Sequence, residues 1–85
     1  MKMEITGDVI RGARGILGLS QERFAARFGG TAVSVCRWEG GARIGGLARI
    51  SLAAAIRAAG GLVEVRAWLA LHPREDVVKV AEEGK

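Results

Sequence analysis

The chain has 85 residues and a formal net charge of +4, with 49% hydrophobic, 26% charged and only 5% aromatic residues. A chain of this length favours one domain with a small core, and the scarcity of aromatic residues means that aliphatic side chains and alanine must fill that core. Thirteen glycines without a strict period, beside a single proline, exclude a collagen-like fibre.

Positive charge is concentrated in the first part of the chain. Residues 1–60 contain nine Lys and Arg against four Asp and Glu, a net charge of +5, whereas residues 61–85 contain four against five, a net charge of −1. A basic segment of this kind favours a polyanionic partner such as nucleic acid. A basic surface that serves only solubility is the alternative.

Cysteine usage and hydropathy indicate the compartment. Cys36 is the only cysteine, so no internal disulfide can form and a reducing environment fits best. No apolar run approaches the roughly 20 residues that a membrane span needs, and the N-terminal residues lack the apolar centre of a signal peptide. We therefore expect a cytoplasmic protein with no membrane partner.

The first predicted helix begins after a Thr6 cap and ends near Gly18. Its apolar residues recur at helical spacing and are Val9, Ala13, Ile16 and Leu17. Gly12 and Gly15 weaken this helix by up to about 1 kcal/mol each relative to alanine. Close packing of another segment against them would explain their presence.

Two short helices follow, separated by a double glycine. Ser20 is the expected cap of one helix, which stops at Gly29–Gly30, and Thr31 caps the next, which runs to about Glu39. The apolar face of the first of these helices consists of Phe24, Ala25 and Phe28. Helices joined by so brief a turn cross at a steep angle.

A fourth helix is predicted from about Gly46 to Ala59, with Gly60–Gly61 as its stop. The residues expected to face inward are Leu47, Ile50, Ala54 and Ile56, and those expected to face outward are Arg49 and Arg57. Helical spacing of the apolar residues is the basis for both assignments.

Beyond residue 61 the apolar residues alternate with other types, which predicts a β-strand over 62–71. A helix over the same ten residues is the alternative. A turn at 72–76 and a second short strand at 77–80 would complete a C-terminal β-hairpin. Because an isolated hairpin is marginally stable and an open strand edge pairs with other chains, we expect a homodimer with these strands at or near its interface.

The helix over 31–39 has two distinct sides on a helical wheel. Val35 and Trp38 share the side expected to be buried, whereas Val33 and Arg37 lie opposite, between Ser34 and Cys36. A helix of about 10–12 Å diameter fits the major groove of B-DNA, which is about 12 Å wide. The outer side would then meet base edges.

Three residues of this helix have side chains whose chemistry fits contacts with DNA. Ala32 and Val33 would contact thymine methyl groups, and Arg37 would reach a guanine edge or a phosphate. Gln21 begins the preceding helix, which would lie across the DNA backbone.

A set of residues in this region matches a known pattern: Ser20-Gln21, Ala25, Gly29, Val35, Arg37-Trp38-Glu39 and Gly41. They resemble the helix-turn-helix of the Cro/cI-type, or Xre, family of DNA-binding regulators, without gaps from Leu17 to Gly41. More weakly, Ala58-Ala59-Gly60-Gly61 followed by VEVRAWL resembles small members in which a glycine turn leads into C-terminal strands. Some of those members are antitoxins.

The sequence departs from the family pattern at the turn and at the start of the following helix. Gly30 replaces a valine-like residue that packs inward, and Thr31, Ala32 and Val33 replace polar residues that often read bases. Specificity is therefore expected to depend on methyl contacts, on one arginine and on DNA shape. The Arg-x-Pro-Ser that often follows is replaced by Arg43-Ile44-Gly45-Gly46, in which Arg43 remains an expected phosphate contact.

The predicted fold is mostly α with a small β part. A four-helix Cro/cI-type helix-turn-helix domain over 1–61 is followed by a C-terminal β-hairpin and tail over 62–85, within the same compact domain and acting as a dimerisation element. The predicted DNA-binding residues are Gln21, Thr31, Ala32, Val33, Ser34, Arg37 and Arg43.

The predicted function is that of a sequence-specific, double-stranded-DNA-binding repressor, which inserts helix 31–39 into the major groove and binds as a homodimer to a pseudo-palindromic operator. The alternative is a protein-interaction module, or an antitoxin, whose C-terminal strands bind a partner such as a toxin. We expect no enzyme activity, cofactor or metal site, because the sequence has no phosphate-binding glycine loop after a strand and no zinc-ligand cluster.

Overall fold

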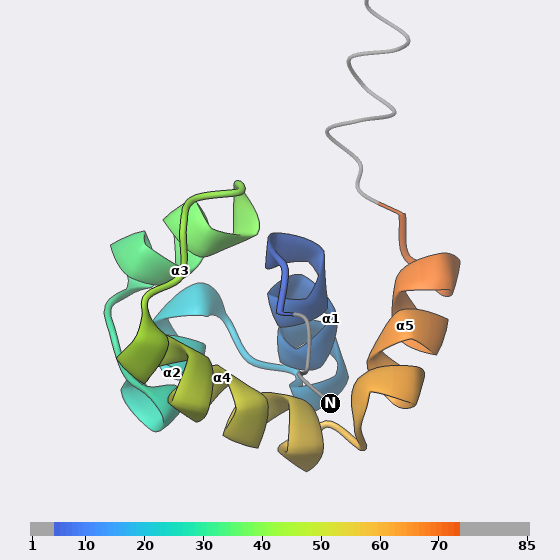
Figure 1. The fold of residues 1–85 in the computed structure, drawn as a ribbon. Helices are drawn as coiled ribbons and strands as arrows, with labels where there is room; N and C mark the ends of the chain where they lie inside the picture. The colour runs from blue at the N-terminus through green and yellow to red at the C-terminus, as the bar shows by residue number, and fades with distance from the viewer. Residues whose placement is uncertain (1–4, 74–85) are drawn as a thin grey trace, which may run out of the picture.

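Helices alone build the part of the chain that the computed structural model describes, residues 5–73 (Figure 1). They are α1 (Gly7–Leu17), α2 (Gln21–Phe28), α3 (Ala32–Glu39), α4 (Gly46–Ala58) and α5 (Leu62–Leu71). The first four lie where the sequence predicts them. Between residues 5 and 73 there is no strand, so the predicted combination of four helices with a β-hairpin is wrong.

Hydroxyl caps set the starts of the first three helices as predicted. Thr6 Oγ1 accepts from the Val9 amide at 3.3 Å, and Ser20 Oγ accepts from the Arg23 amide at 3.1 Å. Thr31 Oγ1 accepts from the Ser34 amide at 3.1 Å. Each cap satisfies one of the amides that the first turn of a helix leaves without an intrahelical partner.

The core lies around α1, which packs against α3, α4 and α5. The largest fully buried side chains are Phe24, Ile10, Leu52, Ile56, Val35 and Val65, so every helix contributes at least one. Figure 1 shows α1 in the middle of the molecule, with α2, α3 and the start of α4 on one side and α5 on the other. A single aliphatic core with one central phenyl ring agrees with the composition.

The predicted strand over 62–71 is instead the helix α5, which corrects both the fold class and the proposed dimerisation hairpin. Val65 is fully buried while Val63 is 81% exposed. A strand would place these two residues on one side, whereas a helix separates them by about 200°. The predicted second strand at 77–80 lies outside the described residues.

Packing against two glycines of α1 explains why this segment is a helix. A Cβ atom on Gly12 would lie 2.8 Å from Val65 Cγ1, and one on Gly15 would overlap the Trp68 ring. The absence of side chains at these positions lets α5 approach α1 closely. The Trp68 ring also stacks on His72 with a centroid distance of 4.0 Å, and Arg11 Nη2 donates to the His72 carbonyl at 3.0 Å.

The rotation of α4 about its axis also differs from the prediction. Leu47 is 85% exposed, and Ile50 and Ala54 are exposed as well, whereas Leu52 and Ile56 are buried. Of the four residues expected inside, only Ile56 lies there. Apolar residues occur all around this helix, so their spacing does not determine which side faces the core.

Within residues 5–73 no single helix is long and apolar enough to cross a membrane. The α4–α5 pair passes the same length and composition test only when taken together, with a bend of 75° between its two parts.

Candidate nucleic-acid interface

The helices α2 and α3 form a pair joined by a tight turn. Gly29 and Gly30 have φ values of 106° and 89°, a left-handed backbone that side-chain-bearing residues resist. Thr31 then caps α3. The turn takes three residues, and α3 packs directly against α2.

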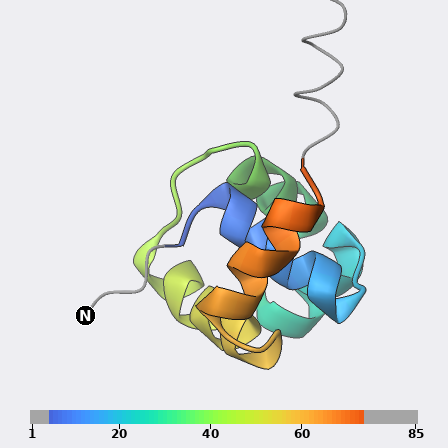
Figure 2. The ribbon, with the colours of Figure 1, turned by 90° about the vertical axis from the view of Figure 1, so that its right-hand side faces the viewer.

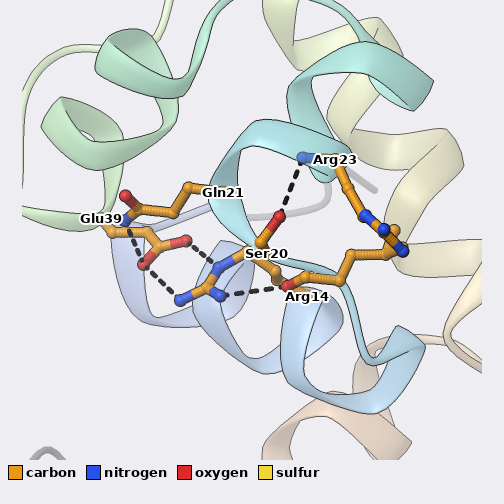
Figure 3. A network of polar contacts seen from close by, with 6 residues as sticks. Arg14, Ser20, Gln21, Arg23 and Glu39 are labelled. Carbon is orange, nitrogen blue, oxygen red and sulfur yellow. Dashed lines mark hydrogen bonds and ion pairs between the residues drawn. The ribbon is translucent and has the colours of Figure 1, made fainter.

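A buried carboxylate anchors α3 to the two preceding helices (Figure 3). Arg14 Nε donates to Glu39 Oε2 at 2.7 Å, and Arg14 Nη2 donates to Glu39 Oε1 at 3.1 Å, so the pair is bidentate. Side-chain exposure is 8% for Glu39 and 23% for Arg14. Arg14 also donates from Nη1 to the Leu19 carbonyl at 3.1 Å, which ties the α1–α2 connection to the same network.

Gln21 belongs to this network. Its Nε2 donates to Glu39 Oε1 at 3.3 Å, and Figure 3 shows the amide turned toward the carboxylate. The side chain is half-buried at the first position of α2. The structure therefore gives Gln21 a positioning contact that the sequence prediction of a DNA contact did not include.

The outer side of α3 is open to solvent. Val33 is 60% exposed, and Cys36 and Arg37 are also exposed. Ala32 and Ser34 are half-buried at its edge. The side that the helical wheel predicts as outward is thus confirmed as outward.

The hydroxyl groups at the start of α3 are engaged locally. Thr31 Oγ1 accepts the Ser34 amide, and the two hydroxyl groups hydrogen-bond to each other at 3.1 Å. Thr31 is exposed at the N-cap position of α3. Its capping bond and its contact to Ser34 leave less hydrogen-bonding capacity for a ligand.

The inner side of α3 faces the core. Val35 is fully buried, and the half-buried Trp38 packs against the core. A Cβ atom on Gly30 would lie 3.1 Å from Trp38 Cη2. A side chain at position 30 would require a small shift of the indole ring, and it would also have to adopt the left-handed φ of 89°.

Arg43 lies in the connection from α3 to α4 and lines a shallow hollow of about 570 Å³ together with Arg49. The first residues of α1 and α4 complete the hollow, and Gly45, which caps α4, has no side chain to bond the first amides of that helix. Two arginines and a helix N-terminus make this hollow electropositive.

The seven predicted DNA-binding residues thus divide into three locations. Residues 32–34 and Arg37 lie on α3 and Thr31 caps it, Gln21 lies at the start of α2 against Glu39, and Arg43 lies beyond the end of α3. The Arg14–Glu39 pair was not predicted from the sequence. Its signal was the position of Glu39 at the edge of the buried side, since a buried carboxylate needs a cationic partner.

Over the part of the chain that the structure describes, no group of three or more His, Cys, Asp and Glu side chains could hold a metal ion. Comparison with protein-family models, with curated proteins and with solved structures gives no match.

Proposed function

We propose that this protein is a sequence-specific DNA-binding regulator of the Cro/cI helix-turn-helix type, acting as a repressor. One observation supports this most strongly: α3 presents a small, basic outer side to solvent, while the bidentate Arg14–Glu39 pair fixes its inner end to α1. A helix that is exposed on one side and rigidly held on the other can enter a groove without rearrangement.

Base contacts are proposed for the outer side of α3. Val33 and Ala32 meet thymine methyl groups, and Arg37, four residues after Val33, reaches a guanine edge. Thr31 and Ser34 contribute less to base recognition because their hydroxyl groups bond to each other. Sequence preference then depends on methyl contacts, on Arg37 and on the shape of the duplex.

Backbone contacts are proposed on both sides of this helix. On one side, the hollow with Arg43 and Arg49 offers two guanidinium groups and the first amides of α4 to a phosphate. On the other side, the start of α2 offers its amides, and Gln21 positions α3 through Glu39. Such contacts fix the register of the protein on DNA, and the net charge of +4 supports them electrostatically.

A homodimer on a pseudo-palindromic operator, with half-site centres about one helical turn or roughly 34 Å apart, is the proposed binding unit. Repression follows if the occupied operator overlaps a promoter. A cytoplasmic location, where the single cysteine stays reduced, belongs to the same proposal.

Selection of duplexes from a random pool by the purified protein tests the proposal. We expect the selected duplexes to share a two-fold-related motif. Arg37→Ala is expected to lose about 1–3 kcal/mol of binding free energy on the selected site, a drop of roughly 5-fold to 150-fold in affinity. Fluorescence anisotropy with a labelled duplex measures this change.

The matched control is Arg57→Ala, which removes another exposed arginine from the last turn of α4, about 16 Å along that helix from Gly46. Its affinity should change less than about twofold, since it lies outside the proposed interface. Failure to enrich any motif, or equal effects of the two substitutions, would contradict the proposed function.

A further inference from the structure

The helix α5 has more apolar surface than the rest of the described chain covers. Eight of its ten residues are apolar, and only Glu64 and Arg66 are charged. Its inner side, with Val65 and Trp68, packs on α1. A helix that is apolar all round is normally buried on all sides, so the uncovered side of α5 calls for a partner.

The uncovered side consists of Val63, Ala67, Ala70 and Leu71, named here the α5 outer stripe. Val63 and Leu71 are 81% and 77% exposed, and both alanines are exposed as well. Their spacing of three and four residues places all four on one side of the helix. In Figure 2 α5 crosses the front of the molecule, and no other described element lies over it.

Charged residues flank the stripe with opposite signs. On a helical wheel, Glu64 lies on one edge of the stripe and Arg66 lies on the other. If two copies of α5 pack side by side in parallel, about a two-fold axis along the helices, each Glu64 meets the Arg66 of the other copy. An antiparallel pair would instead bring Glu64 to Glu64 and Arg66 to Arg66.

We infer that the α5 outer stripe is the interface with a second copy of this chain, with parallel α5 helices and two reciprocal Glu64–Arg66 ion pairs. Such an interface is isologous, because the same residues serve both copies. Ala67 in the middle of the stripe lets the helix axes approach, while Val63 and Leu71 supply most of the apolar contact.

The charged residues favour α5 over α4, the other helix with exposed apolar residues, as the interface between two copies. The exposed side of α4 also carries Leu47 and Ile50, but its exposed charged residues are Arg49 and Arg57. Two copies of that side would bring like charges together. Figure 1 places α1 between α5 and α3, so pairing through α5 leaves the outer side of α3 open.

A charge-swap series measured by analytical ultracentrifugation tests the interface. We expect Glu64→Arg and Arg66→Glu each to raise the dimer dissociation constant by roughly tenfold or more, because each places like charges across the interface. The double variant E64R/R66E should return the constant to within about threefold of the parent value, since it restores both pairs. Val63→Lys should weaken the dimer at least as much as either single reversal.

Two controls match the changes in net charge. Glu22→Arg and Arg57→Glu reverse exposed charges elsewhere on the surface and should leave the dimer constant unchanged. Residues 64 and 66 do not face each other within one helix, so recovery in the double variant cannot come from an intrahelical pair. Far-UV circular dichroism verifies that every variant stays folded.

The inference extends the proposed function by naming its partner copy, yet these measurements contain no nucleic acid, so either proposal can fail alone. A parent chain that remains monomeric at all accessible concentrations overturns the interface, as does a double variant that is weaker than both single variants. A monomeric chain that captures a different protein through the α5 outer stripe overturns it equally.

Discussion

Glu39 shows how one buried acidic residue determines the position of the proposed recognition helix. It lies at the last position of α3, where the helix dipole disfavours a negative charge. The bidentate contact from Arg14 and the amide of Gln21 offset that cost. The same three residues therefore connect α1, α2 and α3 through one carboxylate.

Removal of one member of the Arg14–Glu39 pair should lower the free energy of unfolding more than replacement of both members. We expect Glu39→Ala to lower the free energy of unfolding by about 3 kcal/mol, because it leaves the Arg14 guanidinium partly buried without its counter-charge. The double variant R14M/E39L should lose well under half of that amount. Urea denaturation measures both, with Glu22→Ala as the exposed control, and equal losses would show that the pair is not coupled.

The effect of a substitution at Gly15 on stability also depends on a neighbouring helix. Alanine in an open helix position is favoured by about 1 kcal/mol over glycine. At position 15, however, a Cβ atom would overlap the Trp68 ring, and overpacking typically costs about 1–3 kcal/mol. We expect Gly15→Ala to lower the thermal midpoint. Gly46→Ala, where a Cβ atom would meet nothing within 4 Å, should not lower it.

At the scale of elements, caps and glycine stops were more informative than periodicity. The sequence predicts α1 to α3 because Thr6, Ser20 and Thr31 have side chains that bond the first amides, and glycine follows each helix. The α5 segment has no such cap, and its ten residues fit a period of two as well as one of 3.6. Its contacts to Gly12 and Gly15, distant in sequence, decide the outcome.

The candidate site, too, could be predicted from the sequence only in part. The wheel of α3 correctly predicts that Val33 and Arg37 face outward and that Val35 faces inward, because a short amphipathic helix has a clear apolar side. The contact from Gln21 to Glu39 could not be predicted, since it depends on how α2 crosses the end of α3. The prediction of which side of α4 faces the core was wrong, because alanine and leucine occur all around that helix.

A pair of valine substitutions tests the helical form of α5 directly. Val65→Ala removes two fully buried methyl groups and should cost about 2 kcal/mol of unfolding free energy. Val63→Ala, two residues away, should cost less than about 0.5 kcal/mol when measured at concentrations low enough to keep the chain monomeric. A strand would expose or bury both, so equal losses would contradict the helix.

For the whole molecule, the proposed DNA interface and the proposed dimer interface lie on opposite sides of α1. Basic residues are available to a phosphate backbone at the hollow after α3, whereas α5 carries one acidic and one basic residue. This separation lets one small core support both surfaces. It also predicts that substitutions in one surface leave the other intact.

Salt dependence distinguishes the proposed backbone contacts from base contacts. Arg43→Gln should weaken binding to selected and scrambled duplexes alike, and should reduce the log–log salt slope by about 0.9 for each bound copy. Arg37→Gln should instead reduce the preference for the selected duplex. Titrations between about 50 and about 200 mM salt measure both slopes. An unchanged slope for Arg43→Gln would contradict the phosphate contact, and an unchanged duplex preference for Arg37→Gln would contradict the base contact.

The exposed position of Cys36 on α3 has a practical consequence. It is the only thiol in the chain, and it lies beside Arg37 on the outer side of the helix. A spin label or fluorophore attached there therefore occupies a single, known position without engineering. In an assembly of two copies, the distance between two such labels reports directly on the spacing of the two α3 helices, which can then be compared with the pitch of B-DNA.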